Sequence, residues 1–462
     1  MEGTPRSERL FLAVVAVAVF VSVMAGTMVN VVVPAIGEDL GASEAQVGWV
    51  VTSHLLVFAV GVPLYGRISD FVSLRRLFTA GLLVFAAGSL VCALAPSLPL
   101  LVFGRVVQAI GDAAIPALAG VAVAKVLPPG RRGAALGLIV SSVGVGAAAG
   151  PIIGGFVEQF LGWHFLFYGV LAMALLLIPG SLRLLPDTSE EWRSFDLLGG
   201  VLLGLASGLF LFGITQGQGE GFGSPSSWGS FLGAALAATL FARRIGSVPE
   251  PFVSPKLFRN RVYAAAVLVG FFSMLANIAA TVLVPLLVIE VNGLSPAGAG
   301  LVLTPGAIAV AVLSPRAGRL SDRVGARAPV LAGLAVMGLS LFFVSAFGAG
   351  ASPVLASLGM LGVGAGFALS NPATTNAAAG ALPGEDVGVG LGIYQGLFFL
   401  GGATGPALVG AFLAARRDAG SGALNPLYAL DVAHFSDAFL ALAGFVALAA
   451  AAALGLRSHG GR

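Results

Sequence analysis

The chain has 462 residues, of which 57% are hydrophobic and only 10% are charged. Because charged residues make up about a quarter of an ordinary soluble protein, this composition excludes one and indicates an integral membrane protein. The net charge of +3 gives no reason to expect a nucleic-acid partner, and the single cysteine, Cys92, excludes an intrachain disulfide or a cysteine-based metal site.

Apolar runs fill almost the whole chain, and a spanning helix needs about 20 predominantly apolar residues. The first run is too long for a secretory signal peptide, so we expect it to be retained as a span. The eighth is the weakest, because Arg243 and Arg244 shorten it. The sequence therefore predicts an all-α protein with fourteen transmembrane helices, near residues 10–34, 45–66, 77–95, 98–124, 134–157, 163–184, 196–216, 229–246, 262–288, 297–314, 329–348, 353–380, 388–412 and 435–456.

The distribution of basic residues predicts on which side of the membrane each loop lies. With the N-terminus in the cytoplasm, all 24 basic residues except Arg105, Arg416 and Arg417 fall on the cytoplasmic side. This distribution is the one that the positive-inside rule describes. We therefore expect a multi-pass protein with both termini in the cytoplasm. The preference for Arg over Lys, with abundant Ala and Gly, favours a GC-rich bacterium, so the expected location is its cytoplasmic membrane.

Two pairs of matching segments divide the chain into halves. GRISDFVSLRR at 66–76 matches GRLSDRVGARA at 318–328, and LPPGRRGAALG at 127–137 matches LPGEDVGVGLG at 382–392. The sequence thus predicts a six-helix bundle over 1–185, a two-helix insert over 186–260 and a second six-helix bundle over 261–462. Paired bundles with a site between them are typical of transporters.

The stretch GVGAAAGPIIGG at 144–155 contains a spacing of glycines close to a dinucleotide-binding fingerprint. Such a fingerprint requires a preceding strand and an α/β unit, and here the glycines lie inside an apolar span. Small residues at this density instead allow helix backbones to approach closely in lipid, and Pro151 bends the span.

Several of these segments resemble the major facilitator superfamily, within it the branch of 14-helix drug:proton antiporters that includes tetracycline exporters. The fifth span resembles the antiporter motif G-x-x-x-G-P-x-x-G-G, through Gly146, Gly150, Pro151, Gly154 and Gly155. The fourth resembles L-x-x-x-R-x-x-Q-G through Leu101, Arg105 and Gln108, with Ala109 in place of the glycine. The paired turns resemble the superfamily's motif between the second and third helices, through Gly66, Asp70 and Arg75, and again through Gly318, Asp322, Arg323, Gly325 and Arg327.

The first span departs from this branch. It keeps a T-x-x-N-x-x-x-P pattern in Thr27, Asn30 and Pro34, but Ala25 and Gly26 stand where many members carry an acidic residue. The usual proton site of the first helix is therefore absent.

Asp112 is then the main candidate for proton coupling. It is the acidic residue predicted nearest the middle of the membrane, and no phosphate loop for ATP is found in the sequence. Arg105 precedes it by seven residues, about two helical turns, so both side chains are expected on one helix face towards the central cavity. Intramembrane charges are usually functional, although a static buried pair remains the alternative.

Other polar residues within spans are candidates for lining a substrate cavity. They are Asn30, His54, Gln108, Asn277, Asn371, Asn376, Tyr394 and Gln395, with Phe271, Phe272, Phe367 and Phe398 as candidates for an apolar wall. Each polar residue has an alternative role in a hydrogen bond between helices.

The paired turns are the candidate conformational gate. A carboxylate such as Asp70 or Asp322 can bind arginines and helix N-termini and hold the bundles together on the cytoplasmic side. The residues of this predicted gate are Gly66, Asp70, Arg75, Gly318, Asp322, Arg323 and Arg327; the alternative is that the arginines only fix topology.

The resemblance implies an exporter, not an enzyme, that moves amphipathic or cationic drugs by alternating access and draws on a proton gradient. We expect a monomer in the lipid bilayer with no cofactor, no metal and no nucleic-acid partner. The alternatives are a transporter of a lipid or metabolite, or one without proton coupling. The four histidines, at 54, 164, 434 and 459, lie on separate spans or loops and form no cluster typical of an enzyme.

Overall fold

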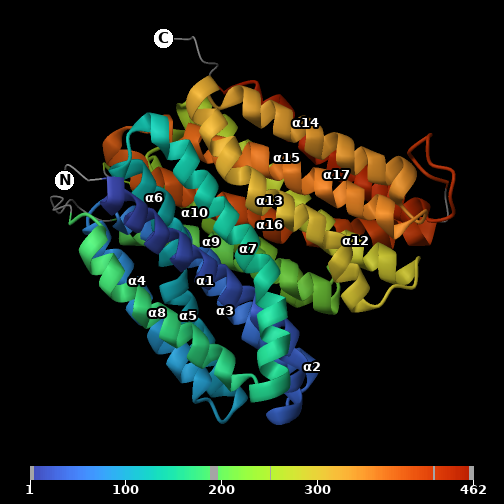
Figure 1. The fold of residues 1–462 in the computed structure, drawn as a ribbon, viewed down its shortest axis with the longest axis horizontal. Helices are drawn as coiled ribbons and strands as arrows, with labels where there is room; N and C mark the ends of the chain where they lie inside the picture. The colour runs from blue at the N-terminus through green and yellow to red at the C-terminus, as the bar shows by residue number, and fades with distance from the viewer. Residues whose placement is uncertain (1–4, 188–195, 250, 420–421, 457–462) are drawn as a thin grey trace.

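The computed structural model describes residues 5–187, 196–249, 251–419 and 422–456, in which every regular element is a helix (Figure 1). Arg193, Arg457 and Arg462 of the expected cytoplasmic clusters lie outside these residues. The first bundle contains α1 (Pro5–Asp39), α2 (Glu44–Val47), α3 (Trp49–Ile68), α4 (Leu74–Ala93), α5 (Leu98–Asp112), α6 (Ala114–Val126), α7 (Pro129–Leu161) and α8 (His164–Leu184).

The second bundle repeats this arrangement of six spans. It contains α12 (Arg261–Glu290), α13 (Pro296–Val324), α14 (Arg327–Phe343) with a π-helical turn at Val344–Gly348, α15 (Pro353–Gly380), α16 (Val387–Ala419), which follows a short 3-10 turn at Gly384–Asp386, and α17 (Ala433–Ala453). Between the bundles come α9 (Leu197–Glu220), α10 (Pro225–Ile245) and the short α11 (Lys256–Arg259).

The described residues contain thirteen helices that are long and apolar enough to cross a membrane, with α5 and α6 counted as one span. Among the longer helices α10 is outside this set; it has 21 residues and carries Arg243 and Arg244 in its last turn. The prediction of an all-α membrane fold of two bundles and an insert is confirmed, and the helix predicted to be the weakest span is the one that falls short.

The paired turns are shorter than predicted. Residues 66–68 belong to α3 and residues 318–324 to α13, so most of the second repeat is helical. The chain between these helices and their successors is only residues 69–73 and 325–326. The polar and glycine residues of this motif, which the sequence predicts to form a turn, therefore continue the helices beyond their apolar stretch.

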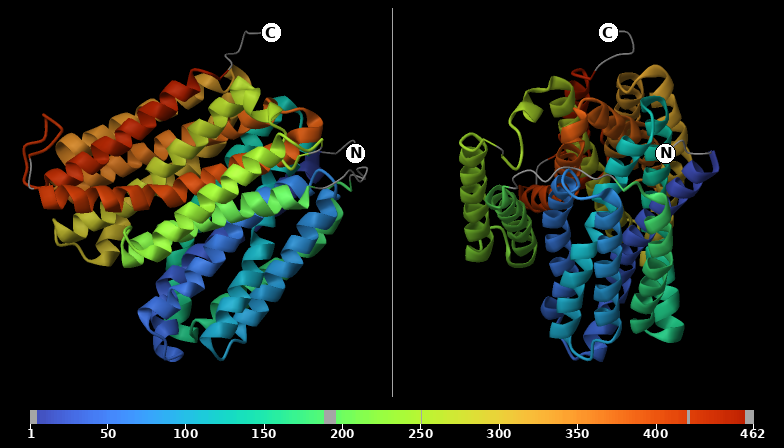
Figure 2. Two further views of the ribbon diagram at one scale, coloured as in Figure 1. Left: turned by 180° about the vertical axis from the view of Figure 1, so that it is seen from behind. Right: turned by 90° about the vertical axis from the view of Figure 1, so that its left-hand side faces the viewer.

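Most basic residues gather at one end of the molecule, which we call the basic end. Helices that reach it finish with basic last turns, such as Arg67 on α3, Lys125 on α6 and Arg183 on α8. The two bundles converge at this end and diverge towards the other, as Figure 2 shows.

The bundles meet chiefly through two helix pairs, α7 with α13 and α3 with α16, and also through α7 with α15 and α6 with α16. The first half of α7 contacts the second half of α13, where the Ser141 hydroxyl donates to the Ala311 carbonyl at 2.6 Å. The second half of α3 contacts the first half of α16, where a Cβ on Gly66 would lie 2.5 Å from Gly392 Cα. Further along, α7 packs on α1 and α16 packs on α12, each within its own bundle. The structure is therefore closed between the bundles at the basic end.

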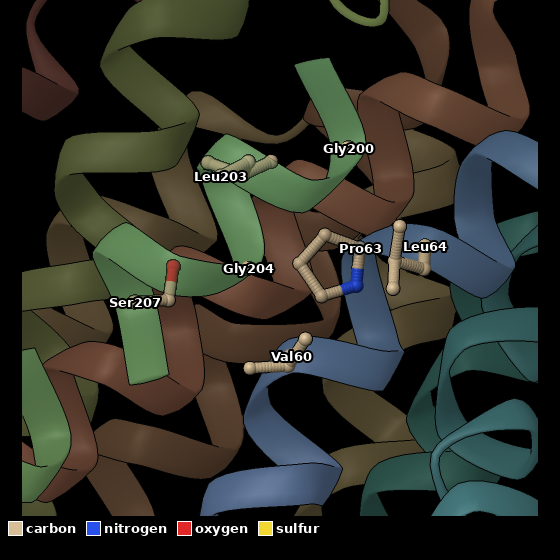
Figure 3. Close-up of a pocket in the computed structure, with 7 residues that line it drawn as sticks. All are labelled: Val60, Pro63, Leu64, Gly200, Leu203, Gly204 and Ser207. Carbon is tan, nitrogen blue, oxygen red and sulfur yellow. The ribbon is translucent and has the colours of Figure 1, made fainter. Parts of the chain in front are cut away.

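The insert lies at one side of both bundles (Figure 2). Its α9 packs against α3 and α16, and α10 packs on α9, where Ser227 donates to the Gly213 carbonyl at 2.8 Å. Figure 3 shows a narrow, mostly apolar crevice where α3 and α9 approach, lined by Val60, Pro63, Leu64, Gly200, Leu203, Gly204 and Ser207.

Asp196 fixes the start of the insert. Its carboxylate accepts from Gly199 N at 3.0 Å, from Phe252 N at 3.1 Å and from Arg244 Nε at 2.7 Å. Burial opposes the charge of this carboxylate, but these donors outweigh it and hold the pKa of Asp196 below its ordinary value. Asp196 thus ties the ends of α9 and α10 to the segment that leads into the second bundle.

Candidate functional site

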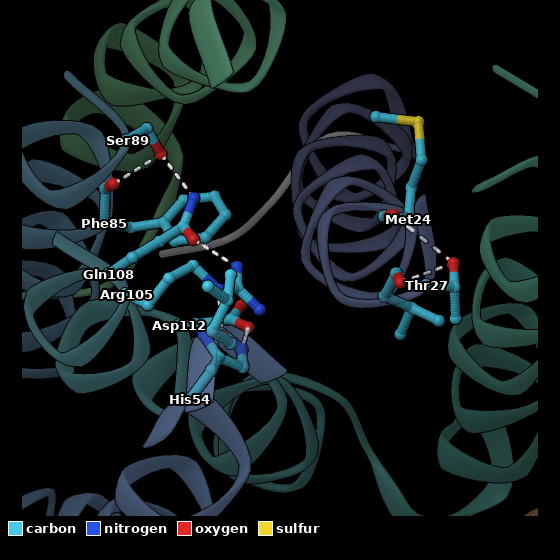
Figure 4. Close-up of polar contacts among 10 residues, drawn as sticks. Met24, Thr27, His54, Phe85, Ser89, Arg105, Gln108 and Asp112 are labelled. Carbon is cyan, nitrogen blue, oxygen red and sulfur yellow. Dashed lines mark hydrogen bonds and ion pairs between the residues drawn. The ribbon is translucent and has the colours of Figure 1, made fainter. Parts of the chain in front are cut away.

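A buried network of charged and polar side chains lies inside the first bundle (Figure 4). Arg105 on α5 donates from Nε to the Val50 carbonyl at 3.0 Å and from a terminal nitrogen to Gln108 Oε1. Gln108 in turn donates to the Ser89 hydroxyl on α4 at 2.8 Å. Arg105 is 1% exposed and Gln108 is fully buried. The guanidinium of Arg105 is therefore shielded from water and bonded to neutral acceptors.

Asp112 completes the network by contacting α3. Its Oδ2 lies 3.2 Å from Nε2 of His54, and the two residues are 2% and 3% exposed. Asp112 is the last residue of α5, and Pro116 four residues on has no N–H to donate to its carbonyl. The helix therefore breaks at Asp112 and resumes as α6, which fixes the carboxyl group at an interruption of the span.

The expectation that Asp112 and Arg105 both face the central cavity is wrong in this conformation. Both side chains are buried within the first bundle against α3, with Arg105 also reaching towards α4 through Gln108. The reason is that their helix face packs on neighbouring helices, so the polar groups bind Val50, His54 and Gln108 rather than water. Their predicted role in coupling is a separate question and stays a prediction.

The predicted cavity residues of the second bundle do not form one group. Asn371 and Tyr394 are joined by Thr375, whose hydroxyl lies 3.1 Å from Tyr394 Oη and bonds to Asn371. Asn376 instead lies at the basic end, where its amide donates to Ser321 and Asp322 at 3.4 Å. It lines a hollow of about 360 Å³ there, together with Arg132 and Asn260.

The remaining predicted cavity residues have partial access to the surface. Asn30 is exposed, while Asn277 and Gln395 are half-buried. Among the candidate wall residues, the Phe398 ring stacks on Tyr394 and approaches Phe367, whereas the Phe272 ring stacks on Phe445 of α17.

The aspartates of the paired turns bind helix N-termini in the opposite bundle. Asp322, on the last turn of α13, accepts from Gly133 N at 2.8 Å and from Ala134 N at 2.9 Å, just after the first turn of α7. Asp70 accepts from Val389 N at 3.0 Å, in the first turn of α16. The N-terminal end of a helix carries a partial positive charge, which favours a carboxylate beside it. The two contacts are related by the internal repeat.

The arginines predicted for the gate differ in their contacts. Arg67, which the prediction did not include, lies 3.6 Å from Asp70. Arg75 binds the Leu185 carbonyl and lies 3.6 Å from Asp187, within its own bundle. The Ser73 hydroxyl, with help from Arg75, lowers the pKa of Asp187. Arg323 is exposed and Arg327 is half-buried at the start of α14.

The glycines of the fifth-span motif face α1. A Cβ would lie 2.8 Å from the Phe20 carbonyl at Gly146, and 2.7 Å from the Met28 carbonyl at Gly154. Gly150, between them, faces Thr27, whose hydroxyl approaches the Gly146 carbonyl at 3.5 Å. The spacing of four residues puts all three on one helix face, which allows the backbones to approach. Gly155 is not on this face; its nearest neighbour would be 3.9 Å away, at Val31.

Sequence reasoning missed three residues that the structure adds to the site. Ser89, Thr375 and Phe58 contact Gln108, Tyr394 and His54 respectively. Thr375 had a signal, since it follows Asn371 by one helical turn. Ser89 and Phe58 are common residue types in spans, and only their partners distinguish them.

Comparison with known sequences identifies the family. The family model of the Major Facilitator Superfamily matches residues 15–406 and 266–458. The chain is 30% identical over 412 residues to the Multidrug resistance protein Stp of Mycobacterium tuberculosis, which covers 89% of this chain and 76% of that protein. It is also 30% identical to the Tetracenomycin C resistance and export protein of Streptomyces glaucescens, over 88% and 76%. The Riboflavin transporter RibZ of Clostridioides difficile is 28% identical over 72% of both chains.

Solved structures agree on the fold. The human organic anion transporter MFSD10 superposes with a TM-score of 0.71 over 98% of this chain and all of its own, at 16% identity. The proton:xylose symporter XylE gives 0.65 over 96% and 94%, also at 16% identity. The duplicated bundles, the paired turns and the sequence matches lead to one conclusion: the chain belongs to the major facilitator superfamily and is a multi-pass membrane transporter.

Proposed function

We propose that this transporter is a proton-coupled antiporter of the 14-helix drug exporter branch, which expels amphipathic small molecules by alternating access. The observation that carries the proposal is the buried network of Arg105, Gln108, Asp112 and His54. Ionisable groups inside a membrane are costly and are usually kept for ion or proton movement. The complete fifth-span motif and the two resistance proteins among the relatives favour export as the direction.

The orientation follows from charge. With the basic end in the cytoplasm the chain obeys the positive-inside rule, and both termini are cytoplasmic in a bacterial cytoplasmic membrane. Asp70 and Asp322 then hold the bundles closed on the cytoplasmic side, which supports their role as a conformational gate. Rocking of the bundles would break both caps together and expose the site to the cytoplasm.

The coupling centre is Asp112, with Arg105 beside it on the same helix. In the alternating-access cycle the centre takes up a proton from one face and releases it at the other, while cargo moves in the opposite direction. Cargo itself would contact the half-exposed polar and aromatic residues between the bundles, such as Asn30, Asn277 and Gln395. A metabolite is the second candidate cargo, because one of the relatives is a riboflavin transporter.

Everted membrane vesicles with an acidified lumen test the proposal directly. Ethidium and tetracycline, added separately, should each raise the lumen pH if export is coupled to proton release. Asp112→Asn should abolish that response and uphill transport, while downhill exchange of labelled tetracycline continues. An absent response in wild-type vesicles to both drugs would refute drug:proton antiport, and a normal response in Asp112→Asn would move the coupling centre elsewhere.

A further inference from the structure

Among the residues that the structure describes, His54 is the titratable side chain that contacts Asp112, and its position differs from those of His164 and His434. His164 begins α8 and His434 is the second residue of α17, whereas His54 lies in the interior of α3. His54 is 3% exposed, and its ring directs Nε2 at Asp112 Oδ2, 3.2 Å away, from a different helix. The carboxyl group of Asp112 therefore belongs to a pair.

The charges of the network decide where an added proton would reside. In the described part of the chain the Arg105 guanidinium bonds to neutral acceptors, and the carboxyl group of Asp112, about two turns along α5, is the group placed to balance its charge. Protonation of Asp112 would remove that balance and also weaken its bond to His54. Protonation of the imidazole would instead place a cation directly against the carboxylate.

From this geometry we propose that the imidazole of His54 carries the coupling proton and that Asp112 acts as its fixed counter-ion. The inference rests on the proposed antiport. In the form without the proton, Nε2–H donates to the Asp112 carboxylate and Nδ1 is bare; Nδ1 is buried and has no hydrogen-bond partner in the part of the chain that the structure describes. Uptake adds a proton from water to Nδ1 and forms an imidazolium, and release returns it to water on the other face.

The titratable and charged groups around His54 and Asp112 offer few other candidates for carrying the proton. Helices α1, α2, α5, α6, α9 and α16 pack against α3, and α4 packs against α5. Arg105 on α5, Cys92 on α4 and Tyr394 on α16 lie within the spans. Among the described side chains of these helices, the other charged ones lie at or near helix ends. They are Glu8, Arg9, Glu38 and Asp39 on α1, Arg67 on α3, Arg75 and Arg76 on α4, Lys125 on α6, and Arg416 and Arg417 on α16.

A row of aromatic rings connects the pair to the interface between the bundles. The His54 ring stacks on Phe58, with ring centroids 6.1 Å apart, and Phe58 meets Phe399 of α16 edge-on at 5.2 Å. A charge on the imidazole changes its attraction to the face of Phe58. Phe58 and Phe399 belong to α3 and α16, one of the helix pairs that join the bundles, so protonation acts beside a contact that must break when the bundles rock.

The test compares His54→Gln with Asp112→Asn in the acid-loaded vesicles. Glutamine keeps an N–H donor for the carboxylate but cannot take up a proton. We expect His54→Gln to lose the rise in lumen pH on addition of ethidium or tetracycline, and to keep downhill exchange of labelled tetracycline. His164→Gln, the same change at the start of α8, should behave as wild type. A normal pH response in His54→Gln overturns the inference and leaves Asp112 as the carrier, whereas no response in wild type refutes the antiport itself.

A second measurement does not depend on the folding of a His54 variant. In wild-type protein labelled with nitrogen-15 at its four histidines, the imidazole that responds to Asp112→Asn identifies His54. We expect this imidazole to carry protons on both nitrogens at about pH 5 and on one at about pH 8, and to remain singly protonated throughout that range in Asp112→Asn. A wild-type His54 that stays singly protonated at about pH 5 would also overturn the inference.

Discussion

Replacement of Gly150 tests whether the close approach of α1 and α7 is required for transport. A Cβ at this position would lie 3.0 Å from Thr27 Cβ and 3.1 Å from the Met24 carbonyl, and closer still to Thr27 Oγ1. Thr27 can withdraw its hydroxyl only by giving up its bonds to the carbonyls of Val23, at 3.0 Å, and Met24, at 3.3 Å. Gly146 fixes the separation of the same helices one turn earlier, so α7 cannot slide to avoid the clash.

Overpacking of a tight interface costs about 1–3 kcal/mol, which corresponds to a change of about 5- to 150-fold in an equilibrium. We expect Gly150→Ala to lie at the low end of this range and Gly150→Leu at or beyond the high end. Because α7 also carries the contact with α13 at the basic end, a wedge at residue 150 tilts it out of register with the second bundle. Gly150→Leu should therefore abolish export while the protein remains in the membrane.

Ethidium export from cells lacking their own pumps measures the effect, with membrane content measured by immunoblot. Gly155→Ala in the same motif is the matched control, because the new methyl group meets only Val31, at 3.9 Å. Thr27→Ala should partly restore the Gly150→Ala variant, since it removes the nearest atom but leaves Thr27 Cβ in place. Export by Gly150→Leu at the wild-type rate would show that the close approach of the two helices is not needed.

Three further predictions concern the gate and the insert. Asp322→Asn removes the negative charge near the N-terminal end of α7, at a cost of about 0.3–1 kcal/mol to the closed contact. A cysteine introduced at Ser314, after removal of Cys92, should then react faster with a maleimide supplied at the basic end, and unchanged reaction would leave the turn with a topological role. Asp196→Asn should lower thermal stability at pH 7, and this loss should shrink as the pH falls below about 4. The reason is that a carboxylate with a lowered pKa contributes stability that disappears when it is protonated. A loss of stability that is constant from pH 7 to pH 3 would contradict this role of the Asp196 carboxylate. A photoactivatable substrate should label the two bundles and not α10, because α10 packs on the outer side of α9 and its Trp228 is 58% exposed. Labelling chiefly of α10 would place cargo at the insert.

Much of this architecture follows from local properties of the sequence. Apolar length fixes most spans, because the thickness of the bilayer sets the length of a crossing helix whatever its neighbours. The distribution of arginines marks one end of the molecule, and the two copies of the turn motif reveal the duplicated bundles. The same local reasoning identifies α10 as the weakest span, because Arg243 and Arg244 shorten its apolar run.

The partners of the functional side chains are decided by tertiary structure. Asp112 and Arg105 share a helix face, which the sequence predicts, but the face packs inward and Asp112 meets His54, 58 residues earlier in the chain. Asp322 accepts from Gly133 N, 189 residues earlier in the chain, and Asn376 joins that contact instead of the cavity. A polar residue in a span must satisfy its hydrogen bonds within the protein, yet many neighbours would satisfy them equally well. Only the packing of helices distant in sequence selects one, which is why the spans could be predicted from the sequence and the contact between His54 and Asp112 could not.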